Sequence, residues 1–141
     1  MTWSQQSWCN RVMVDLTALP PGLYRGTVSG EESGDCQCRI EVRRLTEHAL
    51  SLDYEAVGLD GLQHVEHTIV TSSALHVTAG EFPDVVTFRM SATGQYVADG
   101  APFPMEIHAG WDGGSLTWAW HWAVPGEDLR EKSRATTRPV R

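Results

Sequence analysis

Most of the sequence alternates between apolar and polar residues in short runs, and turn-forming residues bound each run. Residues 36–44 show the pattern most clearly, with Cys36, Cys38, Ile40 and Val42 separated by polar side chains. A period of two places successive side chains on opposite faces of a β-strand. Nine or ten such runs recur at a spacing of roughly ten residues, which predicts an all-β fold. They cover 23–30, 36–44, 49–57, 63–70, 74–79, 84–90, 94–98, 105–111, 116–124 and 128–137.

Strands with one apolar face need a shared interior that covers this face. A sheet that closes on itself supplies such an interior and leaves no exposed edge. We therefore expect a single antiparallel up-and-down β-barrel of about eight to ten strands, with a two-sheet sandwich as the alternative. The chain of 141 residues suits one domain. We assign residues 21–141 to the barrel and residues 1–20 to a short N-terminal helix or capping segment, because Trp8, Val12 and Leu16 recur at helical spacing.

The composition restricts the partners and the location of the protein. The formal net charge is −7, and an acidic chain repels phosphate backbones, so we expect no nucleic-acid partner. No apolar run approaches the ~20 residues that cross a bilayer. The N-terminus also lacks the charged start and apolar stretch of a signal peptide. We therefore expect a cytoplasmic protein with no membrane partner. A homodimer is common for such domains, but no residue marks an interface.

Two of the three cysteines, Cys36 and Cys38, lie on one face of a predicted strand. Their Cα atoms would be roughly 6.7 Å apart, at the far limit of what a disulfide bridges. Reduced core thiols explain this pair, and a metal pair is the alternative. No nearby Cys/His cluster supports a metal. We expect neither a metal nor a cofactor.

Three tryptophans, Trp118, Trp120 and Trp122, stand at alternate positions of one predicted strand. The preceding hairpin can have a two-residue or a four-residue loop, and in the four-residue version Ile107 faces Trp120. Both versions keep the tryptophans on the apolar face, which must be the interior. Indoles fill a core efficiently, but each buried N–H needs a partner. The row fits two interpretations: the wall of a cavity for an apolar or conjugated ligand, and plain packing in a filled barrel.

The same alternation predicts polar groups inside the barrel. In the fourth predicted strand, Val65 and Ile69 mark the apolar side. This assignment brings His67 inward and turns His64 and Glu66 outward. A core histidine that is satisfied by a backbone carbonyl or a tyrosine hydroxyl is the alternative to a functional role.

The last predicted strand supplies a second set of inward polar groups. Leu129 and Ala135 mark its inner side and bring Glu131 and Ser133 inward with them. A buried carboxylate needs a partner, and His67 is the natural partner of Glu131. Buried pairs of this kind are found more often at functional sites than elsewhere. The alternative is that this strand has a different register, because few apolar residues fix it.

A capping segment that leads into "GLYRG" (22–26), a run of antiparallel strands and an arginine-bearing final strand resemble the calycin group of lipocalins and fatty-acid-binding proteins. Lipocalins open with Gly-x-Trp, whereas this chain has Gly22, Leu23 and Tyr24. The resemblance covers the architecture from about residue 20 to the end. It implies an internal site for a small apolar molecule, and calycin-like barrels also serve as cyclases in natural-product pathways. The pattern is similar in outline to nitrobindin-type haem barrels too, but no residue matches their haem-ligating histidine.

Three functions fit these observations. The first is binding of a small hydrophobic or aromatic molecule in the barrel cavity. The second is a cyclase or isomerase in the same cavity, with His67 or Glu131 moving a proton, so the sequence leaves open whether the chain is an enzyme. The third is a filled barrel that acts as a protein-interaction module. The predicted ligand-binding residues are Trp118, Trp120, Trp122, Tyr54, Tyr24, Phe88, Met90, His67, Glu131 and Ser133.

Overall fold

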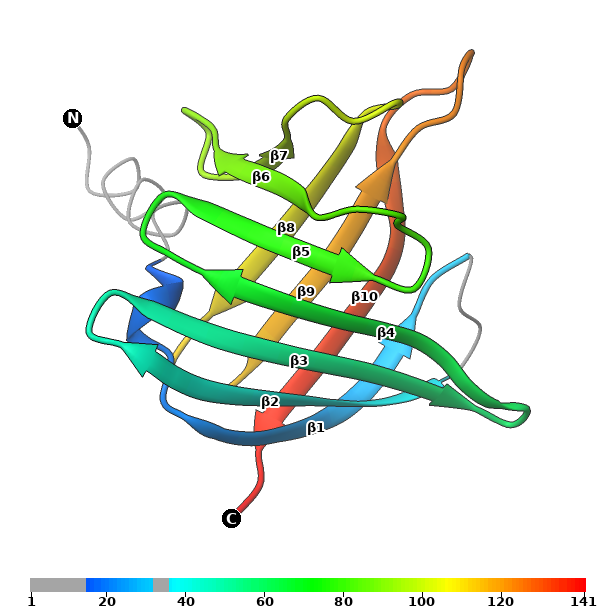
Figure 1. Cartoon of the computed structure of the whole chain (residues 1–141). Coiled ribbons are helices and arrows are strands. Elements are labelled where there is room, and N and C mark those ends of the chain that lie inside the picture. Colours follow the sequence, from blue (N-terminus) through cyan, green and yellow to red (C-terminus); the bar gives the residue numbers. More distant parts are fainter. Residues whose placement is uncertain (1–14, 32–35) are drawn as a thin grey trace, which may run out of the picture.

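The computed structural model describes residues 15–31 and 36–141, which form a closed barrel of ten strands (Figure 1). Each strand pairs antiparallel with its neighbours in sequence, and β1 pairs with β10 to close the ring. The predicted all-β antiparallel barrel is confirmed, and the observed strand limits lie within two residues of the predicted ones. The strands are β1 (Gly22–Ser29), β2 (Cys36–Thr46), β3 (Ala49–Gly58), β4 (Gly61–Val70), β5 (Ala74–Ala79), β6 (Val86–Met90), β7 (Tyr96–Ala98), β8 (Met105–Trp111), β9 (Leu116–Trp122) and β10 (Arg130–Pro139).

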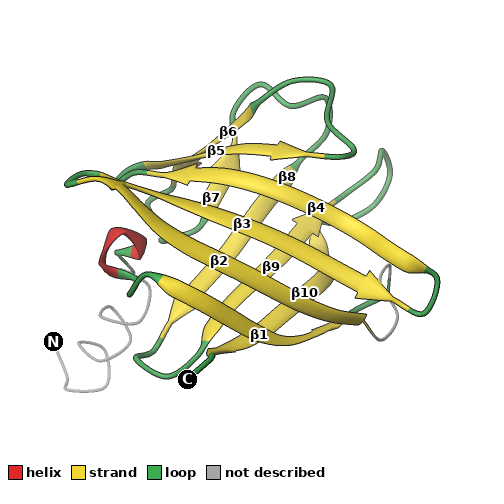
Figure 2. Ribbon diagram, turned by 60° about the horizontal axis from the view of Figure 1, so that its bottom comes forward, coloured by secondary structure: helices red, strands yellow, loops and turns green. Residues whose placement is uncertain are grey.

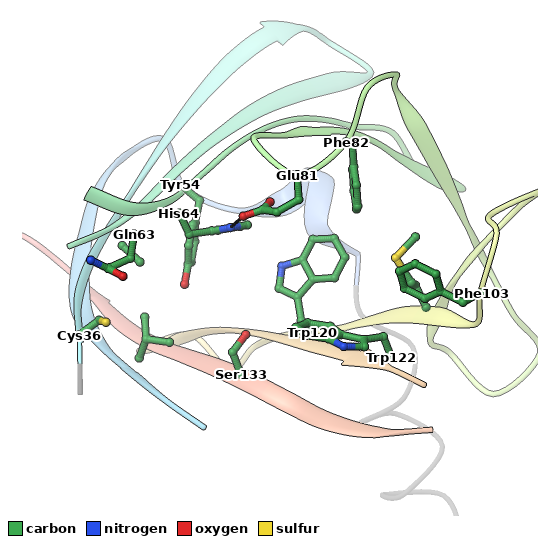
Figure 3. A pocket seen from close by; sticks show the side chains of 13 residues that line it. Cys36, Tyr54, Gln63, His64, Glu81, Phe82, Phe103, Trp120, Trp122 and Ser133 are labelled. Atoms are coloured by element: carbon green, nitrogen blue, oxygen red, sulfur yellow. Dashed lines mark hydrogen bonds and ion pairs between the residues drawn. The ribbon is translucent and has the colours of Figure 1, made fainter. Parts of the chain in front are cut away.

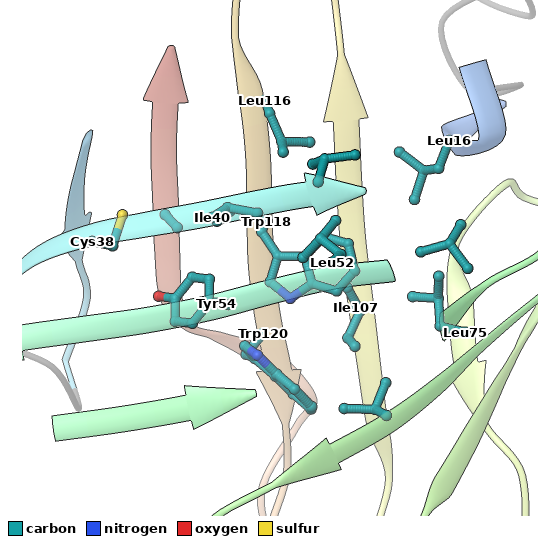
Figure 4. Close-up of a cluster of buried hydrophobic side chains, with 14 of the residues drawn as sticks. Leu16, Cys38, Ile40, Leu52, Tyr54, Leu75, Ile107, Leu116, Trp118 and Trp120 are labelled. Atoms are coloured by element: carbon teal, nitrogen blue, oxygen red, sulfur yellow. The ribbon is translucent and has the colours of Figure 1, made fainter. Parts of the chain in front are cut away.

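A short segment before β1 covers one end of the barrel. It contains the 3₁₀-helix η1 (Leu16–Ala18), which lies at that end in Figure 2. Leu16 and Leu19 are each 1% exposed and belong to the barrel core, and Figure 4 shows Leu16 there. Of the three residues at helical spacing, Leu16 is buried in the barrel core, whereas Trp8 and Val12 lie outside the described residues. No helix in the described ranges is long and apolar enough to cross a membrane.

Tyr24 ties the capping segment to the barrel. The Tyr24 hydroxyl donates a hydrogen bond to the Pro20 carbonyl at 2.7 Å. The Tyr24 ring also meets the Trp111 ring edge-on, with the centroids 5.8 Å apart. The interior behind the cap is filled by fully buried side chains from several strands, so this half of the barrel is closed. They include Leu50 and, as labelled in Figure 4, Ile40, Leu52, Leu75, Ile107, Leu116 and Trp118.

The β8–β9 hairpin has the four-residue loop, and Ile107 faces Trp120 as this version predicts. The side chain of Asp112 holds the loop, because its Oδ1 accepts the N–H groups of Gly114 at 2.8 Å and Ser115 at 2.7 Å. An Asp that accepts from the backbone two and three residues ahead is typical of tight turns. The loop thereby fixes the register that turns the tryptophan row inward.

A β-bulge interrupts the β3–β4 pairing close to its hairpin. Val57 faces Leu62, but the next pair is Ala56 with His64, which leaves Gln63 as an extra residue on β4. An extra residue shifts every later pair by one and so exchanges the two faces of the strand.

The bulge decides which face of β4 lies inside. A regular hairpin would set Val65 opposite Tyr54, whereas Glu66 stands opposite Tyr54. The interior face of β4 therefore carries His64, Glu66, Thr68 and Val70. The predictions that His67 points inward and that Glu66 points outward are both wrong, because the sequence pattern does not reveal the bulge.

A second bulge changes the faces of β10. Glu131 faces His121 and Ser133 faces Trp120, so Lys132 is the extra residue. Ser133 therefore points inward as predicted, whereas the prediction that Glu131 points inward is wrong. The alternative of a different register in this strand is the correct one.

Candidate functional site

The half of the barrel away from η1 contains a cavity of about 380 Å³ (Figure 3). Its wall combines aromatic side chains with a few polar ones, which is typical of small-molecule sites. Side chains of the β5–β6 and β7–β8 loops border it together with the strand ends. The lining residues are Val28, Cys36, Tyr54, Ala56, Gln63, His64, Glu81, Phe82, Phe103, Met105, Trp120, Trp122 and Ser133.

The fully buried carboxylate of Glu66 joins Trp118 and Trp120 to His64. Its Oε2 accepts the indole N–H of Trp118 at 3.1 Å, and its Oε1 accepts the indole N–H of Trp120. Nε2 of His64 lies 2.7 Å from the same Oε1. Three N–H donors thus surround a carboxylate that is 0% exposed, which offsets the cost of burying its charge.

His64 joins this buried carboxylate to a second one at the surface of the cavity. Its Nδ1 lies 2.9 Å from Oε1 of Glu81, which belongs to the β5–β6 loop. Burial lowers the pKa of His64, but the hydrogen bonds and negative charges of Glu66 and Glu81 outweigh burial and raise the pKa to about 9. The ring is therefore an imidazolium at neutral pH and donates an N–H to each carboxylate.

Trp120 separates the filled core from the cavity. Trp120 is 6% exposed. Its ring meets the rings of Phe82 and Phe88 edge-on, at centroid distances of 5.9 and 5.5 Å. Trp118 is 1% exposed and lies in the core, whereas Trp122 lines the cavity. The tryptophan row therefore packs in the core at Trp118 and lines the cavity at Trp120 and Trp122.

Tyr54 brings a hydroxyl to the same wall. Its ring meets the His64 ring edge-on at 5.4 Å, and no hydrogen bond from its hydroxyl is found among the described residues. Burial, followed by the nearby Glu66 charge, raises the pKa of Tyr54 well above its usual value. The hydroxyl therefore stays protonated and can donate to a ligand.

The predicted acid–base pair does not meet inside the barrel. His67 is exposed on the outer face, where its Nδ1 lies 2.8 Å from Oδ1 of Asp53. Glu131 is also on the outer face and accepts from Arg134 at 2.6 Å. The prediction of a His67–Glu131 pair is therefore wrong, and the histidine and carboxylate that meet inside the barrel are His64 and Glu66.

The other predicted ligand-binding residues fall into two groups. Tyr54, Trp120, Trp122 and Ser133 come together at the cavity. Trp118, Tyr24, Phe88 and Met90 do not line it; the first three are core residues, and Met90 packs against the core.

The outward position of His67 has a measurable consequence. We expect His67→Gln to change the free energy of unfolding by less than about 1 kcal/mol, because its pair with Asp53 lies at the surface. Urea unfolding followed by far-UV circular dichroism measures this change. A loss above 2 kcal/mol would place His67 in the interior instead.

The cysteines of β2 behave as core thiols. Cys36 and Cys38 are buried and belong to the barrel core, and burial raises the pKa of Cys38 to about 11. Within residues 15–31 and 36–141, no group of three or more His, Cys, Asp or Glu side chains is placed to hold a metal ion.

Comparisons with known proteins show the fold and no family. No family model and no curated protein matches the chain. The chain is similar to Rv2717c from M. tuberculosis, with a TM-score of 0.65 and 13% identity over 100% of this chain and 99% of that one. It is similar to the S-type phycobiliprotein lyase CPES from Guillardia theta, with a TM-score of 0.59 and 10% identity over 100% and 99%. A redesigned β-barrel, mFAP1, bound to DFHBI matches with a TM-score of 0.50 and 15% identity over 89% and 99%. At 10–15% identity these neighbours show the fold alone.

Proposed function

We propose that this protein binds a small, largely apolar or conjugated molecule in the cavity at the uncapped end of the barrel. The observation that carries the proposal is the division of the interior, which is packed behind η1 but leaves about 380 Å³ beside Trp120 and Trp122. Large flat rings bury much apolar area of a ligand. The ligand-contacting residues are Tyr54, Trp120, Trp122, Ser133, Phe82 and Phe103, with His64 at the polar end.

Two structural neighbours support a ligand-binding role for this kind of barrel. The redesigned barrel mFAP1 is bound to the small molecule DFHBI, and another barrel is named as a phycobiliprotein lyase. At 10–15% identity they share the fold with this chain, so the ligand must be inferred from the cavity itself.

An enzyme that transfers a proton in the same cavity is the second candidate. The observation that favours it is a histidine in the cavity wall that is held by a buried carboxylate, since Glu66 orients His64 through Nε2. A protonated histidine oriented in this way can act as a general acid. Binding that persists in His64→Gln while product formation stops would indicate the enzyme.

The binding proposal is tested with 1-pyrenecarboxamide, a neutral conjugated probe, by calorimetry and by energy transfer from tryptophan to pyrene. We expect saturable binding with one site per chain. Ser133 on β10 is the cross-strand neighbour of Trp120 on β9, so the larger side chain of Ser133→Leu would enter the cavity beside this ring. This variant should weaken binding by at least about tenfold. Thr136→Leu on the outer face of the same strand is the control and should change binding less than about twofold. Equal binding by both variants would show that the probe binds elsewhere, and no binding by any of them would refute the proposal.

A further inference from the structure

The two carboxylates that contact His64 differ in how firmly they are held. Glu66 is 0% exposed and is fixed by the indoles of Trp118 and Trp120. The Glu81 side chain is 57% exposed, comes from the β5–β6 loop, and has His64 as its one partner among the described residues. The Nε2 side of His64 therefore contacts a buried carboxylate that two indoles hold in place, whereas the Nδ1 side contacts an exposed one that water can replace at little cost.

The cavity offers hydrogen-bond donors to a ligand. Nδ1–H of His64 points to Glu81 at the cavity surface, as the dashed contact in Figure 3 shows, and the Tyr54 hydroxyl stays protonated because its pKa is raised. Glu66 already accepts from three N–H groups. Donors beside a positive ring favour a negatively charged acceptor, and they disfavour a ligand cation.

The charge on His64 is present under ordinary conditions. Its pKa of about 9 means that the imidazolium persists well above neutral pH. When Glu81 leaves Nδ1, Glu66 still holds the ring through Nε2 at 2.7 Å. A carboxylate that takes the place of Glu81 would thus find a donor that is already charged and oriented.

We infer that the natural ligand carries a carboxylate, which replaces the Glu81 carboxylate on Nδ1 of His64 when the apolar part of the ligand enters the cavity. Glu81 then acts as an internal competitor that occupies the site when the ligand is absent. The inference rests on the proposed function, because it names the chemical class of the molecule that the cavity binds.

Three probes with the same ring separate the charge classes: 1-pyrenecarboxylate, 1-pyrenecarboxamide and 1-pyrenemethylammonium. Calorimetric titration at pH 7 should give the tightest binding for the carboxylate and the weakest for the ammonium. Glu81→Gln removes the competing charge while it keeps the shape of the side chain. It should tighten carboxylate binding by roughly fivefold and change carboxamide binding by less than about twofold.

Asp84→Asn is the matched control, because Asp84 is an exposed carboxylate in the same loop without a contact to His64. It should change carboxylate binding by less than about twofold. His64→Gln should abolish the preference for the carboxylate over the carboxamide. If Asp84→Asn tightens carboxylate binding as much as Glu81→Gln, the effect is one of general charge and the exchange at His64 is refuted.

The remaining outcomes separate this inference from the proposed function. Carboxamide binding that equals carboxylate binding in both the wild type and Glu81→Gln would refute the carboxylate while the cavity remains a binding site. If the ammonium probe binds most tightly, the carboxylate is also refuted and the cavity still remains a binding site. If none of the three probes binds to either protein, the proposed function fails and this inference fails with it.

Discussion

Glu66→Gln is expected to lower the free energy of unfolding by about 3 kcal/mol, because a buried glutamine cannot replace the carboxylate. Glu66 accepts from the indole N–H groups of Trp118 and Trp120 and from Nε2 of His64. An amide has one acceptor oxygen, and its NH₂ group would face a donor. At least one buried N–H would therefore lose its partner, and the imidazolium of His64 would lose its nearest negative charge.

Urea unfolding of the wild type and the variant, followed by far-UV circular dichroism, measures this loss. Glu55→Gln is the matched control, because Glu55 lies on β3 opposite Val65, which the bulge turns outward. We expect the control to change stability by less than about 0.5 kcal/mol. Equal stabilities of the two variants would show that Glu66 is not the buried acceptor described here.

Stability is also expected to fall as the pH rises from about 6.5 to about 9, and His64 is the cause. Its pKa is about 9 in the folded chain against an ordinary value of 6.5. A raised pKa stabilises the fold fully below 6.5, and this contribution is lost as the pH passes through 9. The groups that face His64 are Glu66 on β4, Glu81 in the β5–β6 loop, Tyr54 on β3 and Trp120 on β9. The contribution is of the order of 3 kcal/mol at most.

The measurement compares the free energy of unfolding of the wild type and His64→Gln between pH 6 and pH 9.5. Groups that do not contact His64 titrate alike in both proteins, so the difference between the two curves reports on His64 and its direct partners. We expect the advantage of the wild type to shrink steadily across this range. A difference that stays constant with pH would mean that His64 is not charged in the folded protein.

The sequence predicts the fold well because most strands follow the alternation without interruption. β2 shows the pattern most clearly, and the Asp112 loop admits few registers for the β8–β9 hairpin. Both strands therefore present the expected faces. The same alternation predicts that the tryptophan row and Tyr54 point inward. The structure places both inside the barrel.

The site could be predicted only in part, because two bulges near the cavity reverse the alternation. Gln63 and Lys132 are the extra residues, and neither is a glycine or proline that would mark an irregularity. On β4 the apolar Val65 and Ile69 suggested the wrong face, and Ile69 is 47% exposed in the structure. Tertiary pairing, and not local pattern, selects the face.

One signal in the sequence does point to the missed carboxylate. Buried indole N–H groups need acceptors, and the row of Trp118 and Trp120 therefore demands a polar group on the opposite wall. Glu66 and His64 meet this demand from β4. The need of the β9 indoles for an acceptor could thus have indicated that Glu66, and not Val65, points inward from β4.

The central claim is that a small molecule binds in the cavity beside Trp120 and Trp122 and leaves the packed half of the barrel undisturbed. The indole N–H signals in a ¹⁵N-correlated NMR spectrum test it directly, with each signal assigned by a Trp→Phe variant. Addition of 1-pyrenecarboxamide should shift the signals of Trp122 and Trp120 and leave the signal of Trp111, at the capped end, in place. A shift of Trp111 without a shift of Trp122 would contradict the claim, and so would a spectrum in which no indole signal moves.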